Sequence, residues 1–546
     1  MAPLFVGSNS DDSRIRSDRV GLAASTSNPA SADTGDAYYN STDNALKIYS
    51  GSDWSGAGGG GTLTGIASGA ITDGQPVIIQ SNGTIAGVGT TGVSASAGTK
   101  VIAKSGAFGA YIGAGFDSHN NRVVFVFRDD NNSSYGTAVV GSVTGTSISF
   151  GTPVTFNEAT TNNNRVVFDS TNNKIIVIYT SSSVRSTIYY RVGTVDPSDN
   201  SISFGSQGEV AGSSNDLPCI AYDSNAQRVV VAFNDNSSSG KAIVGSVSGN
   251  TISWGSAVTF ISSNVYIMPH GITFDSSNNK IVIVFKDYGG NGRAKAVVGT
   301  VSGTSISFGS VVQYTFTDTD YPTVVFDSSK NKLLSVFSDQ SGNGFFSSGY
   351  DSARVGTVTG TGVSFGSQQV WDSSGQAIQY SSGPVYVPSI QKTIIGYRSG
   401  SGGSDYGLFI SAEIKDNSVS FGSTTVWATA LSPGGIVSVY DDNAEKVVFN
   451  FSDNENSSQP ASIVVQPDTV STNLTSTNFL GISNGAYSDG STVTVQIEGS
   501  VDDAQSGLTV GKRHYVQNDG SLGITTGDFA VSAGIAISTT KIAIES

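Results

Sequence analysis

The sequence predicts an all-β protein built around a seven-bladed β-propeller. A motif of an aromatic residue, Asp and Ser, followed by an Asn-rich turn and an apolar run, recurs seven times at intervals of 52 to 61 residues. Each copy continues through a second apolar run, and no helical periodicity separates the copies. Four strands in each unit of about 50 residues are typical of radially repeated sheets. The copies begin at Phe116, Phe168, Tyr222, Phe274, Phe326, Val387 and Tyr440, and the copy at Val387 is degenerate.

Apolar patterns predict the order of the strands within a unit. The run IVIVF from Ile281 is apolar throughout, so we expect a strand covered on both faces. The run SISF from Ser305 alternates, which predicts a strand covered on one face only. A proline in a strand requires an unpaired edge, and the innermost strand of a blade has one. Four units carry proline within or just before their first strand, at Pro218, Pro269, Pro322 and Pro384.

The seventh unit lacks an SISF-like fourth strand, and a replacement is found before the first unit. The segment TGVSASAGTKV from Thr91 aligns with TGVSFGSQQV from Thr361. We therefore expect residues 91–101 to complete the seventh blade and close the ring. The alternative is a coincidence between two segments rich in Gly, Ser and Thr.

Four regions follow from this division: an N-terminal attachment segment (1–61), a small β module (62–90), the propeller (91–470) and a C-terminal β module (471–546). The segments LTGIASGAITDG and LGISNGAYSDG share a signature. They predict either two small related β domains, which we favour, or one domain and a partial copy of it.

The N-terminal region contains one candidate hairpin, at residues 35–54, followed by a Gly-rich linker. Its turn would span residues 41–44. A two-stranded hairpin is marginally stable alone, so we expect it to pack on another chain or a larger assembly. The side chains expected to build it are Tyr38, Tyr39, Leu46, Ile48, Tyr49 and Trp54.

Composition excludes several classes of function. The chain has 28 Lys and Arg against 43 Asp and Glu, a net charge of −15, so it lacks the clustered cations of a nucleic-acid-binding surface. No apolar run approaches the ~18 residues of a membrane span, and no secretory signal begins the chain. The single cysteine, Cys219, cannot form an internal disulfide, and the run LPCIAYD predicts a buried small hydrophobe there.

Three segments resemble one family. The string GDAYYNSTDNALKIYSGSDW from Gly35 resembles a hairpin motif near the start of tail-fibre and appendage proteins of tailed bacteriophages. The segment from Gln505 (QSGLTVGKRHYVQNDGSL) resembles a terminal module of such proteins from marine phages, and GTAVVGSVTGTSISFG from Gly136 resembles their propeller repeats.

The resemblance implies a virion structural protein on the tail or capsid surface, assembled in the host cytoplasm. Its partners would be other virion proteins and a glycan or protein of the host surface. Phage fibres commonly wrap three such hairpin segments about one axis, so a homotrimer is implied. No catalytic residue and no cofactor is implied.

Loops on one face of the predicted propeller vary between units, and a rigid scaffold with variable loops is a common place for binding. We expect that face to bind a host receptor without covalent chemistry. Aromatic rings beside Asp, Asn and Gln suit sugar stacking; the alternative is that the rings only cover longer loops. The candidate residues are Phe345, Phe346, Tyr350, Trp371 and Tyr380.

Two sets of aspartates recur with the repeat. The first opens the Asn-rich turn, where a side chain that accepts backbone hydrogen bonds predicts turn capping: Asp117, Asp169, Asp223, Asp275, Asp327 and Asp441. The second ends the apolar run, where turn capping is favoured and a Ca²⁺ site, which needs 6–8 oxygen ligands, is the alternative: Asp129, Asp235, Asp287, Asp339 and Asp453.

Catalysis has little support in the sequence. The histidines His119, His270 and His514 lie in separate units without a metal-binding spacing, so we expect no zinc site. Two carboxylates for glycoside cleavage could occur by chance among 43. A hydrolase of host polysaccharide therefore remains one alternative to a binding protein, and a purely structural capsid or tail component is the other.

Overall fold

The computed structural model describes residues 24–29, 37–40, 45–49, 54–56, 61–181, 186–235, 238–339, 350–372, 383–399, 406–428, 433–453, 456–526 and 529–545. The chain forms two compact units, one made of Ser94–Thr469 and the other of Met1–Val93 with Val470–Ser546. Its labelled helical elements are the 3-10 turns η1 (Tyr288–Gly290) and η2 (Pro388–Ile390). Within the described ranges, no helix has the length and apolar character needed to cross a membrane.

Each sequence repeat forms one antiparallel meander of the unit Ser94–Thr469. The strands of the first three meanders are β11 (Gly109–Asp117), β12 (Arg122–Asp129), β13 (Tyr135–Thr144), β14 (Ser147–Phe150), β15 (Val154–Asp169), β16 (Lys174–Ser181), β17 (Ser186–Asp196), β18 (Ser201–Phe204), β19 (Gly208–Asp223), β20 (Arg228–Asp235), β21 (Ser239–Ser248), β22 (Thr251–Trp254) and β23 (Val258–Ile261).

The fourth to sixth meanders continue the pattern. In each of them a short strand pairs with the third strand, as β23 pairs with β21 in the third meander. Their strands are β24 (Val265–Tyr266), β25 (Ile272–Asp275), β26 (Lys280–Asp287), β27 (Arg293–Ser302), β28 (Ser305–Phe308), β29 (Val312–Gln313), β30 (Thr319–Asp327), β31 (Lys332–Asp339), β32 (Tyr350–Thr359), β33 (Gly362–Phe365), β34 (Gln369–Asp372), β35 (Val385–Val387), β36 (Lys392–Ser399), β37 (Tyr406–Lys415), β38 (Ser418–Phe421) and β39 (Thr425–Ala428).

The last meander combines both ends of the unit. The strands are β40 (Pro433–Asp441), β41 (Lys446–Asp453) and β42 (Gln459–Gln466), joined by β9 (Ser96–Ala97) and β10 (Val101–Ile102).

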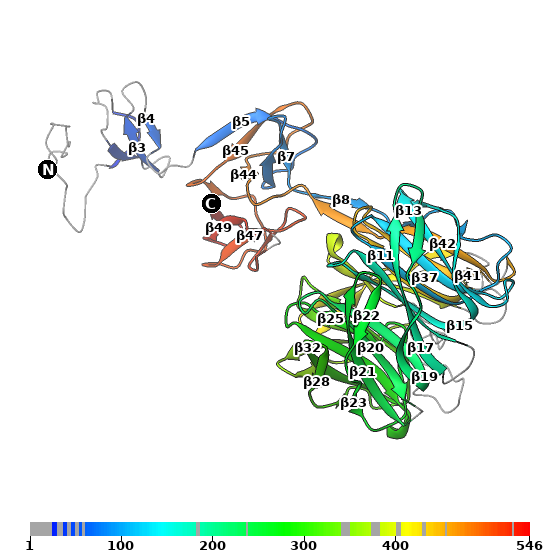
Figure 1. Cartoon of the computed structure of the whole chain (residues 1–546). Coiled ribbons are helices and arrows are strands. Elements are labelled where there is room, and N and C mark those ends of the chain that lie inside the picture. Colours follow the sequence, from blue (N-terminus) through cyan, green and yellow to red (C-terminus); the bar gives the residue numbers. More distant parts are fainter. Residues whose placement is uncertain are drawn as a thin grey trace. The chain divides into compact units, whose positions relative to one another are not determined.

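The first strands of successive meanders contact one another in a closed cycle. The order is β11, β15, β19, β25, β30, β35, β40 and again β11. Within a meander the strands lie side by side, as β20, β21 and β22 do in Figure 1. A closed ring of antiparallel sheets is a β-propeller, so the predicted all-β propeller fold is confirmed.

The Asn-rich turns between first and second strands are capped as predicted. In the first repeat, the buried Asp117 Oδ1 accepts hydrogen bonds from the backbone N–H groups of His119 and Asn120, both at 3.0 Å. Asn121 then adopts a left-handed conformation, with φ 54°. The same pair of backbone bonds recurs at Asp169, Asp223, Asp275, Asp327 and Asp441.

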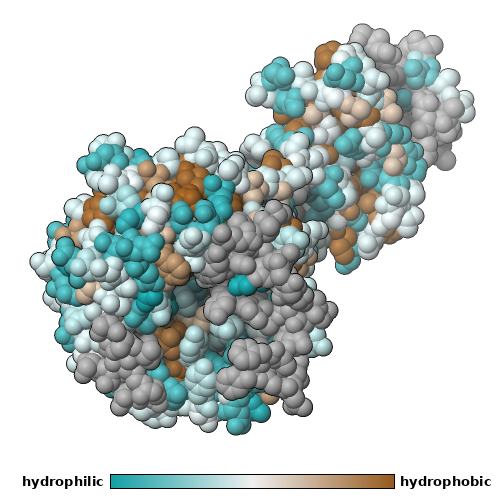
Figure 2. Space-filling model, turned by 90° about the vertical axis from the view of Figure 1, so that its right-hand side faces the viewer, coloured by the Kyte–Doolittle hydropathy of each residue, from teal (hydrophilic) through white to brown (hydrophobic). Residues whose placement is uncertain are grey.

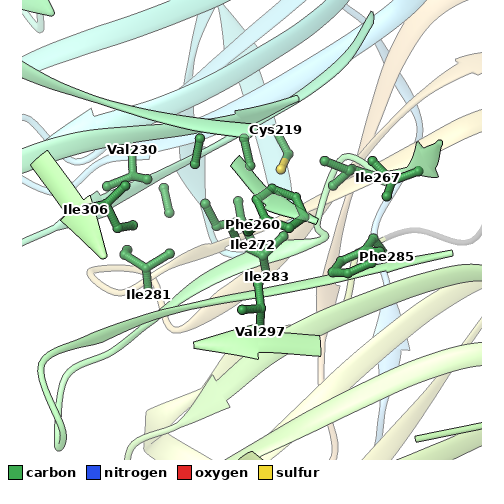
Figure 3. Packing of buried hydrophobic residues seen from close by; sticks show 14 of the residues in the cluster. Cys219, Val230, Phe260, Ile267, Ile272, Ile281, Ile283, Phe285, Val297 and Ile306 are labelled. Atoms are coloured by element: carbon green, nitrogen blue, oxygen red, sulfur yellow. The ribbon is translucent and has the colours of Figure 1, made fainter. Parts of the chain in front are cut away.

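Blades pack on one another through their apolar strands. In the cluster of Figure 3, Cys219 and Val230 lie on one side and Ile281 and Val297 on the other. Phe260 lies between them. Because each run of second-strand residues is buried on both faces, each blade contributes to the core on either side of it. On the face of the molecule shown in Figure 2, the hydrophobic residues left at the surface form small separate patches.

Strands β9 and β10 close the ring. Ala97 pairs with Val465, and Val101 pairs with Ser462. The Lys100 ammonium also forms an ion pair with the fully buried Asp453.

The predicted register of this closing strand was wrong by two residues. Ala97, and not Ala95, occupies the place that Phe365 takes in the fifth meander, where Phe365 pairs with Gly356. A shift by two keeps every side chain on its face. The propeller therefore begins after β8 (Thr90–Val93), which pairs with β43 (Thr469–Thr472) outside the ring.

The two related flanking segments do not form separate modules, contrary to the prediction. They contribute alternate strands to one five-stranded sheet, in the order β5-β45-β44-β6-β7. Ile71 and Tyr487 exchange backbone hydrogen bonds at 2.8 and 3.0 Å. The strands are β5 (Thr62–Ile66), β6 (Pro76–Ile79), β7 (Ile85–Gly87), β44 (Phe479–Ser483) and β45 (Thr492–Gln496).

A second sheet in this unit consists of C-terminal strands only, in the order β46-β50-β49-β47-β48. One apolar cluster joins the two sheets, with Ile78 and Ile482 packed with Val516 and Ile542. Residues 62–90 and 471–546 therefore share a core. The strands are β46 (Val501–Asp502), β47 (Arg513–Val516), β48 (Leu522–Gly523), β49 (Ser532–Ala536) and β50 (Ile542–Ile544).

The N-terminal hairpin is present as backbone pairing. Strand β2 (Ala37–Asn40) pairs antiparallel with β3 (Ala45–Tyr49), within a sheet that also contains β1 (Ala24–Ser25) and β4 (Trp54–Gly56). The expected turn, residues 41–44, lies outside the described residues. The predicted trimer stays a prediction.

Candidate functional site

Five first strands have a β-bulge at the same position relative to the turn between the first and second strands. In β11, β15, β19, β30 and β40 the pairing register shifts around a residue six positions before the turn aspartate. That residue is in the left-handed region, with φ between 48° and 67°. Pro218 and Pro322 directly follow it, where the shifted ladder needs no donor. The bulge residues are Tyr111, Asn163, Leu217, Tyr321 and Gly435.

A cavity of about 450 Å³ is lined by three of these bulge residues, Tyr111, Asn163 and Gly435. Its wall includes the start of β11 and the residues Ser452 and Ser458, on either side of the loop from β41 to β42. Loops from second to third strands lie at that end, so the cavity is at the variable-loop end of the propeller. The volume is within the range of small-molecule sites. The lining residues are Phe108, Gly109, Ala110, Tyr111, Ile112, Asn163, Arg165, Met268, Pro269, Gly435, Ile436, Val437, Ser452 and Ser458.

Two exposed aromatic rings belong to the wall of this cavity. The exposed fractions of Tyr111 and Phe108 are 47% and 38%. The Arg128 guanidinium lies over the Tyr111 ring, 4.5 Å from its centroid, and donates a hydrogen bond of 2.9 Å to Asp130. A ring supported in this way is a rigid platform for a ligand.

The backbone of Tyr111 is strained and held in place. A bulky residue in the left-handed region costs roughly 1–2 kcal/mol. The fully buried Asn164 donates its Nδ2–H to the Tyr111 carbonyl oxygen at 2.7 Å. Gly113 lets β15 approach this closely, because a Cβ there would lie 2.8 Å from the Asn164 carbonyl oxygen. Strain that the surroundings maintain is common at functional sites.

A smaller cavity of about 70 Å³ shares Ile112, Arg165, Pro269 and Val437 with the first. His270 lines it, and the buried Nε2 atom of this imidazole has no hydrogen-bond partner among the described residues. Burial, and secondarily the charge of Arg165, lower the pKa of His270 to about 4. The imidazole is therefore neutral at pH 7.

This pKa predicts a pH dependence of stability. The unfolded imidazole takes up a proton below its ordinary pKa of 6.5, whereas the folded one does so only near 4. The folded state then binds fewer protons than the unfolded state. The free energy of unfolding therefore decreases by up to about 3 kcal/mol as the pH is lowered from 6.5 to 4. Denaturant melts should show that His270→Gln loses this part of the pH profile. The exposed His119→Gln is the control, and a wild-type profile for His270→Gln would contradict the prediction.

Of the five aromatic residues predicted to bind a ligand, the two that the structure describes, Tyr350 and Trp371, do not line this cavity. Phe345, Phe346 and Tyr380 lie outside the described residues. Tyr350 begins β32 and is exposed. The Trp371 ring packs against the Phe421 ring of the next blade at 5.1 Å between centroids, which fits the alternative that aromatic rings cover the scaffold.

The second set of aspartates is bonded within the blades. Asp129 pairs with Lys104 at 2.5 Å and Asp287 with Lys295 at 2.6 Å. Lysines also pair with Asp235 and Asp453, whereas Asp339 accepts hydrogen bonds from Thr317 and from Gln368. Few of these contacts are hydrogen bonds that cap a turn. One that does is the 3.2 Å bond that the Asn131 backbone N–H donates to Asp129. The sequence did not predict the lysine partners.

The residues that could bind a metal ion or act as a nucleophile are the His, Cys, Asp and Glu side chains of the described part of the chain. No group of three or more His, Cys, Asp or Glu side chains there could hold a metal ion. Cys219 is buried in the core between two blades, as predicted, and burial raises the pKa of its thiol to about 12. Its thiol therefore remains protonated and packs as an apolar group.

The sequence interpretation missed Phe108, Tyr111, Asn163, Arg165 and Met268. One signal was available. Aligned on the turn aspartate, the positions six to four residues before it read YIG, NNR, LPC, PHG, YPT and GIV in the six units that have this aspartate. These positions diverge where the following strand is uniform, and Arg165 is the charged residue among them.

No protein-family model matches the chain, and no curated protein matches it. Among solved structures it is similar to the BP39L lectin from Burkholderia pseudomallei (TM-score 0.47, 9% identity, 64% of this chain and 94% of the lectin). It is also similar to a putative 6-phosphogluconolactonase from Bacteroides uniformis (0.42, 12%, 68% and 98%). A third similar structure is the α-L-arabinanase of Penicillium chrysogenum complexed with arabinobiose (0.40, 11%, 68% and 98%). The strand pairing and the closed cycle of first strands show the propeller fold.

Proposed function

We propose that this protein is a non-catalytic binding protein that recognises a saccharide in the cavity at the variable-loop end of its propeller. One observation carries the proposal. The cavity combines a rigid, exposed Tyr111 platform with the polar Asn163, Ser452 and Ser458, and its described wall contains no Asp or Glu. An apolar cavity with a few polar groups that orient the ligand is typical of small-molecule sites.

Binding is favoured over hydrolysis by the same wall. Most glycoside hydrolases place two carboxyl groups roughly 5 to 9.5 Å apart around the scissile bond. The described lining residues supply neither, and the recurrent aspartates bond to lysines and turn backbones elsewhere.

The resemblance of the flanking segments supports a setting for this activity. We propose that the protein is carried on the tail or capsid surface of a bacteriophage, where the saccharide belongs to the host surface. A purely structural appendage is the competing proposal, and it predicts no saccharide binding.

The test is a glycan array probed with the full-length chain, followed by titration calorimetry on the best ligand. Tyr111→Asn should weaken binding about tenfold, or about 1.4 kcal/mol, because it removes the ring but suits a left-handed backbone, as Asn163 does at the equivalent position.

The matched control is Tyr321→Asn, the same change at a bulge that does not line the cavity. Equal losses in both variants, or no bound glycan, would contradict the proposal. Release of reducing ends from a bound glycan would favour a hydrolase instead.

A further inference from the structure

The charge on the cavity wall is the starting point for the nature of the ligand. Among the described residues that line the two cavities, Arg165 is the one that carries a full charge at pH 7, since burial keeps His270 neutral. The chain as a whole has a net charge of −15. A cation in the wall of an apolar cavity within an acidic protein selects for an anionic group.

Arg165 is placed to contact a ligand in both cavities. It belongs to the wall of each, in β15, two residues after the bulge residue Asn163. Its Nη1–H donates a hydrogen bond of 2.7 Å to the Asn164 carbonyl oxygen, which fixes the guanidinium against the same residue that holds the Tyr111 backbone. Arginine is suited to carboxylates because its N–H groups form a planar fork that two oxygens can accept.

The aromatic platform and the cation are held by one network. The Asn164 side chain donates a hydrogen bond through Nδ2 to the Tyr111 backbone carbonyl oxygen. The Asn164 backbone carbonyl oxygen accepts the hydrogen bond from Arg165. Asn164 therefore fixes the position of Tyr111 relative to Arg165. A ligand that spans the two would present an apolar ring face to Tyr111 and an acidic group to Arg165.

We propose that the cavity binds an acidic saccharide, whose ring lies on Tyr111 and whose carboxylate lies against Arg165. The proposal rests on the proposed function and names the ligand class of the same site. The smaller cavity beside His270 has room for a few water molecules, which can solvate the side of the carboxylate that faces away from Arg165.

The experiment uses the full-length chain and saccharide pairs that differ in one carboxylate: glucuronate with glucose, galacturonate with galactose, and N-acetylneuraminate with its methyl ester. We expect the acid to bind at least about tenfold more tightly than its neutral partner in at least one pair. That preference should decrease between about 50 and 500 mM NaCl, because it is electrostatic.

Three variants separate the contributions. Arg165→Gln should remove the preference for the acid, Arg165→Lys should retain part of that preference, and Tyr111→Asn should weaken the binding of both members of a pair. Melting curves establish that each variant folds. If Arg165→Gln fails to fold, the test is whether Arg165→Lys reduces the preference for the acid and whether NaCl does so. Sodium acetate, as the free carboxylate, should compete only weakly.

Each other outcome overturns a defined part of the proposal. Equal affinity for acid and neutral members would reject the acidic ligand and leave saccharide binding intact. Acetate that binds as tightly as glucuronate would reject the saccharide and leave a carboxylate site. Full-length chain that binds no member of any pair, and no glycan on the array, would reject the proposed function itself.

Discussion

Removal of β9 and β10 is expected to lower the melting temperature of the propeller unit by about 10 °C or more and to cause association. The comparison is between residues 94–469 and residues 104–469, measured by thermal melts and light scattering. The two fragments contain the same strands, except that the shorter one lacks β9 and β10. A difference in melting temperature or association therefore reports on ring closure.

Two costs explain the size of the effect. Without β9 and β10 the long strand β42 becomes an exposed edge, which templates pairing with another chain. The buried Asp453 also loses Lys100, and an uncompensated buried charge costs about 3–5 kcal/mol. At about 2.1 cal/mol/K of unfolding entropy per residue, a unit of this size loses roughly 1 °C of melting temperature per kcal/mol, so the lost ion pair accounts for about 4–6 °C and the lost strand pairing for the rest.

Lys100→Ala in the longer fragment separates the two costs. It removes the ion pair but keeps the strands, so we expect an intermediate melting temperature and a monomer. A shorter fragment that stays monomeric and melts with the longer one would show that the ring does not depend on this closure.

The propeller and its turns could be predicted because their determinants are local. The turn aspartate accepts hydrogen bonds from the backbone N–H groups two and three residues on, and the left-handed Asn121 follows within the same turn. The closing register was missed by two residues because small Gly, Ser and Thr side chains specify a register weakly, and a shift by two leaves the faces unchanged.

Long-range pairing was outside the reach of the sequence. The strands β5 and β45 pair although about 430 residues separate them, so the prediction of two modules from two similar segments is wrong, because the segments complete one sheet. The cavity was missed for the same reason, because Tyr111, Arg165 and Met268 come from three different repeats. Divergence between repeats marked the positions of Tyr111 and Arg165, and no such signal marked Met268.

The contact between neighbouring blades is expected to be as sensitive as the closure. Glycine follows the fourth strand of most blades and lies against the next blade's turn between third and fourth strands. A Cβ added at Gly255 would overlap the carbonyl oxygen of Thr304. The same relation holds for Gly98 with Thr146, Gly151 with Asn200, Gly309 with Thr361 and Gly366 with Asn417.

Gly255→Ala should therefore destabilise the protein by about 3 kcal/mol, because the atom it meets belongs to a backbone that can move only with its whole blade. The matched control is Gly362→Ala, where the nearest atom to the added Cβ is the Thr359 carbonyl oxygen at 3.7 Å, an ordinary contact. Urea melts should show a reduced midpoint for the first variant and little change for the second. Equal midpoints would mean that the blades can separate by a Cβ radius at no cost. The closing glycine Gly98 makes the same contact from the N-terminal strand, so Gly98→Ala should lower the midpoint as much as Gly255→Ala if that strand is a full member of the ring.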